Sequence, residues 1–316
     1  MSKPLISVVM SVYNGSQYLR EAVDSILNQT CTDFEFIIID DGSTDGTAAI
    51  LDSCTDPRIR VIRHKNQGLT KSLNLGIREA QGTYVARQDA DDRSFPERLA
   101  TQAAFLDSHP EIPLVGSAVK VISSAGAELA TFRHPTDSAE IATTLRTYNC
   151  FWHGSIMFRR DSFLELGGYD ERFVTAQDYD MWLRFSERHL LANLPEPLYA
   201  YRFTAGSVTV KRMVSQHRLA VLARRLAEER ACGSGNTPED IAPYLAAPLS
   251  LAEKGQIINN YKPWCRLLLK NDLAGEAATL MAALFRHHPN PLFRVAFAVA
   301  RQFKTPSLLT RFLEHA

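Results

Sequence analysis

Three aspartates, Asp89, Asp91 and Asp92, stand together in one short polar segment directly after an apolar run. Several like charges in one loop repel each other unless a cation is present. Oxygen ligands without a nearby His or Cys favour a hard ion such as Mg²⁺ or Mn²⁺, which keeps waters and shares phosphate oxygens with its substrate. A solvated acidic turn that caps the next helix is the simpler alternative, and the segment alone leaves both interpretations open.

A second acidic pair, Asp40 and Asp41, ends another apolar run and is followed by Gly42 and Ser43. Turn formation and helix capping explain the Gly and the Ser. They explain less well why a buried strand should end in two carboxylates, which suit an acceptor for a nucleobase N–H or a ribose hydroxyl. Tyr13, after the first apolar run, could stack on the base or belong to the core.

These residues require a scaffold that brings their loops together. Short apolar runs alternate with amphipathic stretches over the first hundred residues, which is typical of a parallel α/β sheet. Ligands of such sheets bind at the carboxyl ends of the strands, so we expect the loops after the first, second and fourth strands to form one site. The predicted strands are 6–13, 35–40, 60–64 and 84–87, and the predicted helices are 18–29, 47–53 and 70–80.

The later sequence divides into two parts. It predicts helices at 96–108, 161–166 and 179–188, strands at 114–122 and 199–203, and less regular sequence between 122 and 160. From about residue 211 the strand signals stop and the chain becomes rich in Ala, Leu and Arg. We expect a catalytic domain over residues 1–210 and a helical region over residues 211–316.

The composition is that of a soluble globular protein: 316 residues, 45% of them hydrophobic, with 35 basic side chains against 35 acidic ones. The overall composition and charge do not point to a nucleic-acid partner. The five cysteines are far apart, which predicts neither a disulfide framework nor a zinc site. The first apolar run is too short for a signal peptide and no later stretch approaches a membrane span, so we expect a cytoplasmic protein.

Taken in order, six segments resemble family 2 glycosyltransferases, whose GT-A fold is a nucleotide-binding α/β sheet followed by an acceptor-binding half. The resemblance covers residues 5 to about 205. The matching segments are Val8–Gly15, Ser25–Thr30, Ile38–Asp45, Ala86–Asp92, Gly167–Asp170 and Gln177–Arg184.

The resemblance implies a role for each residue of the nucleotide end. Ser11 and Tyr13 would bind the nucleotide, with Tyr13 against the base, and Asp41 would accept from the ring N–H of the base. Asp89 would lie near the ribose, and Asp91 would be the ligand of a divalent metal, Mn²⁺ or Mg²⁺.

Asp178 matches the catalytic base of the family, and the preceding residue is Gln177 where Glu is usual. An inverting transfer needs a carboxylate that takes the proton from the acceptor hydroxyl. Helix capping is the structural alternative for Asp178. His153, Gln177 and Arg202 match the acceptor or diphosphate region, although His153 could equally be structural. Thr204 stands where relatives often have a His.

The resemblance implies an inverting, metal-dependent transfer of a sugar from a nucleotide diphosphate sugar, expected to be a UDP sugar, to a glycan or lipid-linked glycan. The motif and membrane helices of processive synthases are missing, so one transfer per encounter is expected. A catalytically inactive nucleotide-sugar binder is the alternative. A sugar-phosphate nucleotidyltransferase is a further one, but it needs a Gly-rich basic loop that the segment after residue 12 does not offer.

Basic residues outnumber acidic ones toward the end of the chain. Such a region could lie on an anionic membrane surface, at the inner face of the membrane, or be an ordinary helical domain with solvated arginines. The basic residues are Lys262, Arg266, Lys270, Arg286, Arg294, Arg301, Lys304 and Arg311.

Overall fold

The structure, a computed structural model, describes residues 3–204, 212–233, 241–286, 288, 290–300, 302 and 305–315. The chain forms two compact units. Unit one comprises Met1–Val121, Thr131–Arg202 and Leu222–Asn236, and unit two comprises Ile122–Ala130, Phe203–Val221 and Thr237–Ala316. The boundary expected between residues 210 and 211 falls outside the described residues.

The strands are β1 (Ile6–Val12), β2 (Phe34–Asp40), β3 (Ile59–Arg63), β4 (Tyr84–Asp89), β5 (Arg93–Ser94), β6 (Leu114–Ile122), β7 (Glu128–Phe132), β8 (Met157–Arg159) and β9 (Leu191–Arg202). They form one sheet in the order β3-β2-β1-β4-β8-β6-β9-β5, with β7 paired to β6. The ladders among β1 to β4 are parallel. The pairs β4 with β8, β6 with β8, and β5 with β9 are antiparallel.

The four strands predicted in the first hundred residues are confirmed as β1 to β4, and they form the parallel part of the α/β sheet. The sequence did not predict β7 or β8. It predicted only the end of β9, which begins at Leu191. β7 and β8 lie between residues 122 and 160, where the sequence is less regular.

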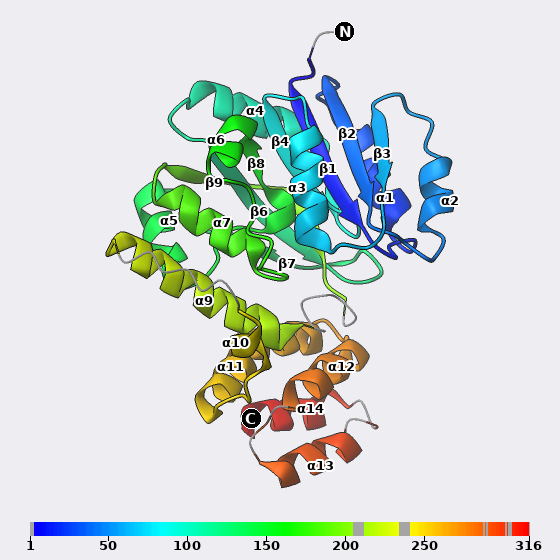
Figure 1. Ribbon diagram of the computed structural model, residues 1–316. Coiled ribbons are helices and arrows are strands. Elements are labelled where there is room, and N and C mark those ends of the chain that lie inside the picture. Colours follow the sequence, from blue (N-terminus) through cyan, green and yellow to red (C-terminus); the bar gives the residue numbers. More distant parts are fainter. Residues whose placement is uncertain are drawn as a thin grey trace. The chain divides into compact units, whose positions relative to one another are not determined.

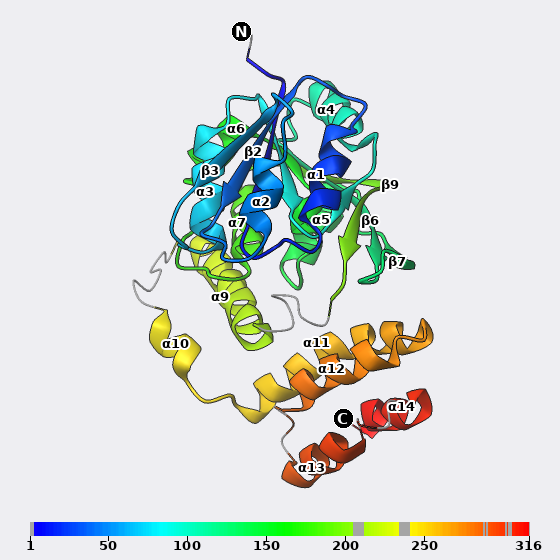
Figure 2. The same cartoon turned by 90° about the vertical axis from the view of Figure 1, so that its right-hand side faces the viewer.

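Helices cover both faces of this sheet. Figure 2 shows α1 (Leu19–Leu27) and α4 (Arg98–Ser108) on one side and α3 (Leu69–Glu79) and α6 (Arg160–Glu165) on the other. Alternate residues of β1 divide between the faces, because successive side chains of a strand point in opposite directions. Val8 and Met10 lie in the core with α1 and α4, while Val9 faces Gly76 of α3.

Three further helices complete the described helices before β9. They are α2 (Thr47–Asp52), α5 (Ser138–Leu145) and α7 (Gln177–Ser186), and a short 3₁₀ turn, η1 (His153–Ser155), precedes β8. In Figure 1, α3 crosses in front of the parallel strands. The sequence predicted α2 and α7 but not α5, whose N-cap Asp137 accepts from the backbone N–H groups of Ala139 and Glu140.

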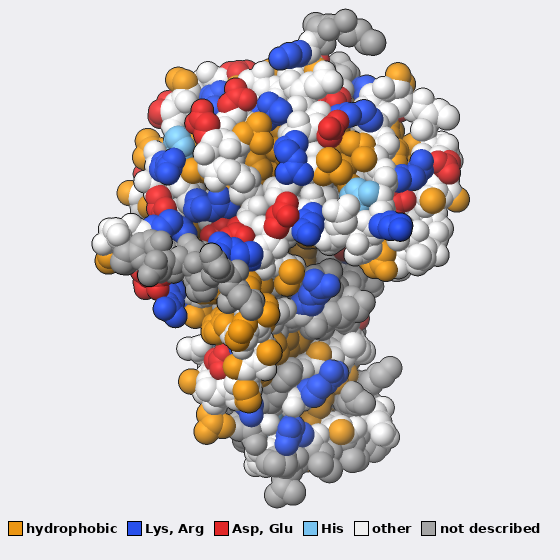
Figure 3. Space-filling view, in the orientation of Figure 1, with side chains coloured by type: hydrophobic (Ala, Val, Ile, Leu, Met, Phe, Trp, Pro, Cys, Tyr) orange, Lys and Arg blue, Asp and Glu red, His pale blue; other side chains and the backbone are white. Residues whose placement is uncertain are grey.

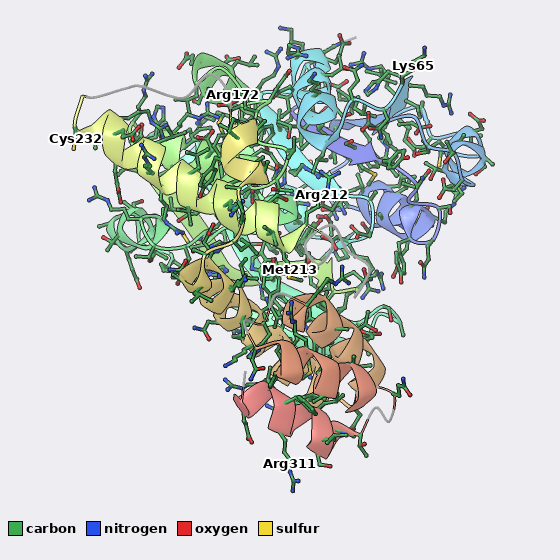
Figure 4. All side chains as sticks on the ribbon, turned by 60° about the horizontal axis from the view of Figure 1, so that its bottom comes forward. Lys65, Arg172, Arg212, Met213, Cys232 and Arg311 are labelled. Carbon is green, nitrogen blue, oxygen red and sulfur yellow. The ribbon has the colours of Figure 1, made fainter. Side chains whose placement is uncertain are left out.

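Only helices follow β9 in the part of the chain that the structure describes. Figure 4 labels Met213 at the start of the first of them and Cys232 just beyond its end. They are α9 (Met213–Ala231), α10 (Ala242–Ala246), α11 (Leu251–Lys270), α12 (Ala274–Phe285), α13 (Pro291–Ala300) and α14 (Pro306–His315).

Unit two has an apolar core of its own, in which Cys265, Leu268, Leu280 and Met281 are fully buried. Its buried guanidinium, Arg218, is held by neutral acceptors and one carboxylate. Arg218 donates to the carbonyl oxygens of Leu245 (2.9 Å), Ala247 (2.7 Å) and Pro248 (3.1 Å), and it pairs with Glu253 at 2.8 Å. Such a fully bonded arginine fixes the start of α11.

None of the helices within the described residues combines the length and the apolar composition that crossing a membrane requires. On the face drawn in Figure 3, the Lys and Arg side chains of unit one lie scattered among acidic and apolar ones.

Candidate active site

The acidic segment forms a closed turn between β4 and β5, held by the side chain of Gln88. Buried Gln88 donates from Nε2 to the carbonyl oxygens of Asp89 (2.9 Å) and Asp92 (3.2 Å). Its Oε1 accepts from the hydroxyl of Ser94 at 2.7 Å. Both ends of the turn are therefore tied to one amide, and the aspartates between them have a fixed backbone.

A buried arginine of α4 supports this turn from inside unit one. Arg98 donates to Ser94 Oγ (2.8 Å) and to the carbonyl oxygens of Arg87 (2.7 Å) and Ile156 (3.0 Å). Burial lowers the pKa of Arg98 to about 10, so the guanidinium keeps its charge at neutral pH. A fixed positive charge thus lies beneath the acidic turn.

Asp89 is held by residues that sequence reasoning did not assign to the site. Arg87 Nη2 lies 2.5 Å from Asp89 Oδ1, and the backbone N–H of Asp89 donates to the hydroxyl of Tyr199 at 3.1 Å. Gly154 of η1 packs directly against Asp89 and Tyr199, where a β-carbon would clash. Nothing in the local sequence around Gly154 or Tyr199 marks this contact.

Burial and neighbouring negative charge both disfavour the ionised forms of Asp91 and Asp92. Burial first, and then the charge of Asp89, raises the pKa of Asp91 above its ordinary value. Burial, Asp91 and Asp89 raise the pKa of Asp92 as well. Adjacent carboxyl groups with raised pKa values resist ionising together, and a bound cation would relieve that resistance.

The donor set fits a hard divalent ion that shares its coordination with a diphosphate. Among the residues that the structure describes, no group of three or more His, Cys, Asp or Glu side chains is arranged to hold a metal ion by itself. Mg²⁺ and Mn²⁺ sites of this kind use one or two carboxylates plus waters and phosphate oxygens. Asp91 and its neighbours can supply the carboxylates.

Arg202 at the end of β9 fastens the acidic turn from the other side. Its backbone N–H donates to Asp92 Oδ1 at 2.7 Å, and its Nε donates to the carbonyl oxygen of Asp91 at 2.8 Å. The same guanidinium pairs with Glu21 of α1 at 2.5 Å and lies 4.4 Å above the ring of Tyr18. The sequence placed Arg202 in the acceptor or diphosphate region, and its contacts in the structure are with the acidic turn.

The predicted nucleotide residues lie at the same edge of the sheet. Ser11 pairs with Asp89 across the β1–β4 ladder, and Val12 pairs with Asp40 across the β1–β2 ladder. Tyr13 follows directly and is 54% exposed, which leaves its ring open to a stacking partner. The loops after β1, β2 and β4 therefore begin side by side, as the parallel order requires.

Asp41 is buried, and its carboxylate holds the loop before α3. Oδ1 accepts from the backbone N–H of Gln67 at 2.8 Å and Oδ2 from that of Gly68 at 3.0 Å. His64 Nδ1 lies 3.4 Å from Oδ1. Each carboxylate oxygen can accept a second hydrogen bond. The bonds to Gln67 and Gly68 are therefore compatible with the predicted hydrogen bond from the ring N–H of the nucleobase.

Asp178 lies in the first turn of α7, next to buried Gln177, and Ala176 before them has a positive φ of 56°. Its Oδ2 accepts from Asn149 Nδ2 at 2.9 Å. Burial raises the pKa of Asp178 to about 6, and the charge of Asp89 contributes to this shift. Contacts also link the two regions: Gly154 packs against Asp89, and the adjacent His153 contacts Trp182 of α7, the helix that carries Asp178.

His153 sits in the wall of the site. Its Nε2 lies 2.8 Å from the hydroxyl of Tyr169, and the ring of Trp182 packs against it at 6.1 Å. Burial and the charge of Arg87 keep the pKa of His153 well below its ordinary value, so the imidazole is neutral at pH 7. Thr204, which follows β9, has a hydroxyl side chain where the resemblance leads us to expect a His.

Solved structures resemble this chain in fold. TarS 1–349 of S. aureus, in complex with UDP-GlcNAc, superimposes with a TM-score of 0.57 at 18% identity over 99% of this chain and 91% of that one. The mannosyltransferase PcManGT of Pyrobaculum calidifontis, in complex with GDP-Man and Mn²⁺, gives a TM-score of 0.54 at 18% identity, covering 99% and 86%. At this identity the likeness establishes the GT-A fold.

Relatives at higher identity establish the family. The putative glycosyltransferase EpsE of Bacillus subtilis is 34% identical over 268 residues, 82% of this chain and 94% of that protein. The amylovoran biosynthesis glycosyltransferase AmsE of Erwinia amylovora is 33% identical over 214 residues, 66% of this chain and 80% of that protein. The family model described as "Glycosyl transferase family 2" matches residues 7–167, which include the turn with Asp89, Asp91 and Asp92. With its fold, its acidic turn and these relatives in agreement, the chain belongs to glycosyl transferase family 2 and is a glycosyltransferase.

Proposed function

We propose that this glycosyltransferase moves a sugar from a nucleotide diphosphate sugar, a UDP sugar in the first instance, to a hydroxyl of a glycan or lipid-linked glycan, with inversion at the anomeric carbon. One observation carries the proposal. Gly154 packs against Asp89, and the adjacent His153 contacts Trp182 of α7, so the helix that carries Asp178 lies close to the acidic turn. A base and a diphosphate-binding turn are the two parts that such a transfer needs.

In this proposal the proton transfer is the role of Asp178, which matches the base of the family. Its ionised carboxylate takes the proton of the acceptor hydroxyl while that oxygen attacks the anomeric carbon. The bond from this carbon to the diphosphate oxygen breaks, and the nucleoside diphosphate leaves with the electron pair. A base with a pKa near 6 is ionised at neutral pH and yet more basic than an exposed aspartate.

The acidic turn receives the leaving diphosphate. Asp91 would hold the divalent ion, Mn²⁺ or Mg²⁺, which supplies positive charge to the departing oxygens. Asp89, fixed by Arg87 and by Tyr199, would lie nearer the ribose. Ser11, Tyr13 and Asp41 would bind the nucleoside at the adjoining loops.

Four named proteins support the donor and acceptor classes. The fold neighbours bind UDP-GlcNAc and GDP-Man, the latter with Mn²⁺. AmsE is named for amylovoran biosynthesis, and WbnJ of Escherichia coli, 34% identical over 183 residues, for O-antigen biosynthesis. Both names point to a surface polysaccharide as the product, built here by one transfer per encounter.

For the basic C-terminal region, the packing of unit two favours an ordinary helical domain. The apolar residues Leu309 and Leu313 of α14 are buried, while Arg311 points away from the helices (Figure 4). Two basic residues of this region, Arg301 and Lys304, lie outside the described residues. Contact with the inner face of a membrane stays a prediction, which flotation with phosphatidylglycerol vesicles tests.

The proposal is tested by nucleotide release and product formation from a panel of UDP and GDP sugars, with Mn²⁺ or after EDTA. We expect metal-dependent turnover of one donor that Asp91→Asn abolishes. Asp161→Asn, at an exposed aspartate of α6, is the matched control and should leave turnover unchanged. Donor binding without metal-dependent turnover would identify an inactive nucleotide-sugar binder. Formation of a nucleotide sugar from a sugar phosphate would identify a nucleotidyltransferase.

A further inference from the structure

Five aromatic side chains of unit one lie together at its surface, and none of them is fully buried. His134 lies between Tyr148 and Trp152, with ring centroids 6.5 and 6.3 Å away. Trp152 also contacts Tyr201 at 4.8 Å and Phe132 at 5.7 Å. We name Phe132, His134, Tyr148, Trp152 and Tyr201 the aromatic surface cluster.

Neighbours of Trp152 in the sequence point the other way, into the core. Phe151 contacts buried Trp182 at 6.1 Å, and His153 contacts buried Tyr169 at 5.5 Å. The segment therefore presents alternate side chains to the interior and to the aromatic surface cluster. Tyr148 is exposed and the other four rings are half-buried, so the cluster presents a partly exposed aromatic surface, which is a candidate binding surface.

One member of the cluster is adjacent in the sequence to the residue that contacts Asp178, the proposed base. Tyr148, which is 52% exposed, directly precedes Asn149, whose side chain donates to Asp178 at 2.9 Å. Tyr148 and Asn149 are thus consecutive residues of the segment that contacts Asp178. The cluster belongs to this side of the site, whereas Tyr13 follows β1 at the nucleotide side.

We infer that the aromatic surface cluster is the acceptor subsite and that it stacks against a pyranose ring of a glycan acceptor. The inference rests on the proposed function and names what its acceptor side recognises. One face of a pyranose presents C–H groups, which pack well on the electron-rich face of an aromatic ring, while the hydroxyls at the sugar's edge stay free. One such hydroxyl can then meet Asp178, in a site that combines aromatic walls with few polar groups.

The inference is tested by saturation-transfer NMR, which needs no turnover. The probes are methyl pyranosides and the disaccharides lactose, cellobiose and chitobiose, with UDP and Mn²⁺ titrated into the same samples. We expect the wild type to transfer saturation to the C–H protons of at least one sugar. Tyr148→Ala and Trp152→Ala should raise its Kd by roughly three- to tenfold. Tyr148→Phe and Trp152→Phe, which keep a ring, should stay close to the wild type.

Two controls separate this surface from the nucleotide side. Tyr13→Ala, at an equally exposed tyrosine, should weaken UDP and leave the sugar Kd unchanged. Leu190→Ala, at a side chain that is 53% exposed, should change neither. If Trp152→Ala does not fold, Tyr148→Ala, at an exposed residue, still tests the inference.

Three results would overturn the inference: unchanged sugar binding by the alanine variants, loss of UDP binding instead, or absence of saturation transfer to every sugar in the wild type. Loss of UDP binding would mean that the cluster holds the nucleotide. A wild type that binds sugars but not UDP would contradict the proposed function and leave the acceptor subsite standing.

Discussion

The side-chain amide of Asn149 donates a 2.9 Å hydrogen bond to Asp178 Oδ2. This bond opposes the effect of burial, which raises the pKa of Asp178, because it favours the ionised carboxylate. Asn149 therefore both orients the base and keeps it ionised at neutral pH. Asn149, which is distant from Asp178 in the sequence, would thus set the pH range over which the proposed base is ionised.

Replacing Asn149 by Ala should move the acid limb of the pH profile of kcat/KM upward. The lost bond to a charged group is worth about 1.5–3 kcal/mol, which corresponds to roughly one to two pH units. Activity should fall more at pH 6 than at pH 8, since the base is then protonated over more of the range. Asn28→Ala, which removes a bond to the carbonyl of Asp24 on α1, is the control and should leave the profile in place.

Asp178→Asn should make the protein more stable at pH 8 than the wild type. The folded-state pKa of about 6 exceeds the ordinary value of 3.8, so between these values the folded chain binds more protons than the unfolded one. Wild-type stability then falls as the pH rises through this window, while the variant lacks that loss. Urea denaturation at pH 8 and pH 4 checks this prediction. An equal difference at both values would contradict it.

Gly154→Ala should disturb the site because a β-carbon there would meet the hydroxyl of Tyr199 and the carboxylate of Asp89. Relieving the overlap should cost about 1–3 kcal/mol of stability and should weaken donor binding. Gly255 of α11 faces open space, so Gly255→Ala should be neutral or stabilising by up to about 1 kcal/mol. Thermal unfolding and titration with the donor measure both effects, and equal behaviour of the two variants would refute the packing argument.

Glu21→Gln should weaken the response to Mn²⁺. Glu21 pairs with Arg202, which in turn holds the backbone of Asp91 and the side chain of Asp92. The partly exposed pair is worth about 1 kcal/mol, so the Mn²⁺ concentration for half-maximal activity should rise about fivefold.

The matched control is Glu79→Gln, which removes an exposed pair with Arg60 on a different part of the sheet. Its response to Mn²⁺ should match the wild type. If both variants shift the Mn²⁺ response equally, the shift would result from the change in net charge. The contacts that link Glu21 through Arg202 to the acidic turn would then have no specific role.

The parallel half of the fold was predictable because its signals are local. β1, β2 and β4 are continuous apolar runs that end in polar loops, and parallel order brings such ends together. The short strand β8 (Met157–Arg159) and the early part of β9 carry little local pattern, since their pairing depends on neighbours distant in the sequence.

The acidic residues of the candidate site could be proposed from the sequence, whereas the residues that support them could not. Asp89, Asp91 and Asp178 stand out by type and by resemblance, and the coupling of Asp89 to Asp178 agrees with placing them together. Asn149 and Glu21 were missed because a single Asn or a helical Glu has no distinguishing spacing. Their importance arises only from contacts that the tertiary fold creates.

The central claim, that Asp178 is the base of an inverting sugar transfer, is tested most directly by single-turnover transfer with Asp178→Asn. We expect the rate of glycosidic product formation to fall by about 10²- to 10⁴-fold while the Kd of the metal-bound donor stays within about twofold of the wild type. A variant that transfers sugar at the wild-type rate, or one that loses donor binding to the same extent as transfer, would contradict the claim.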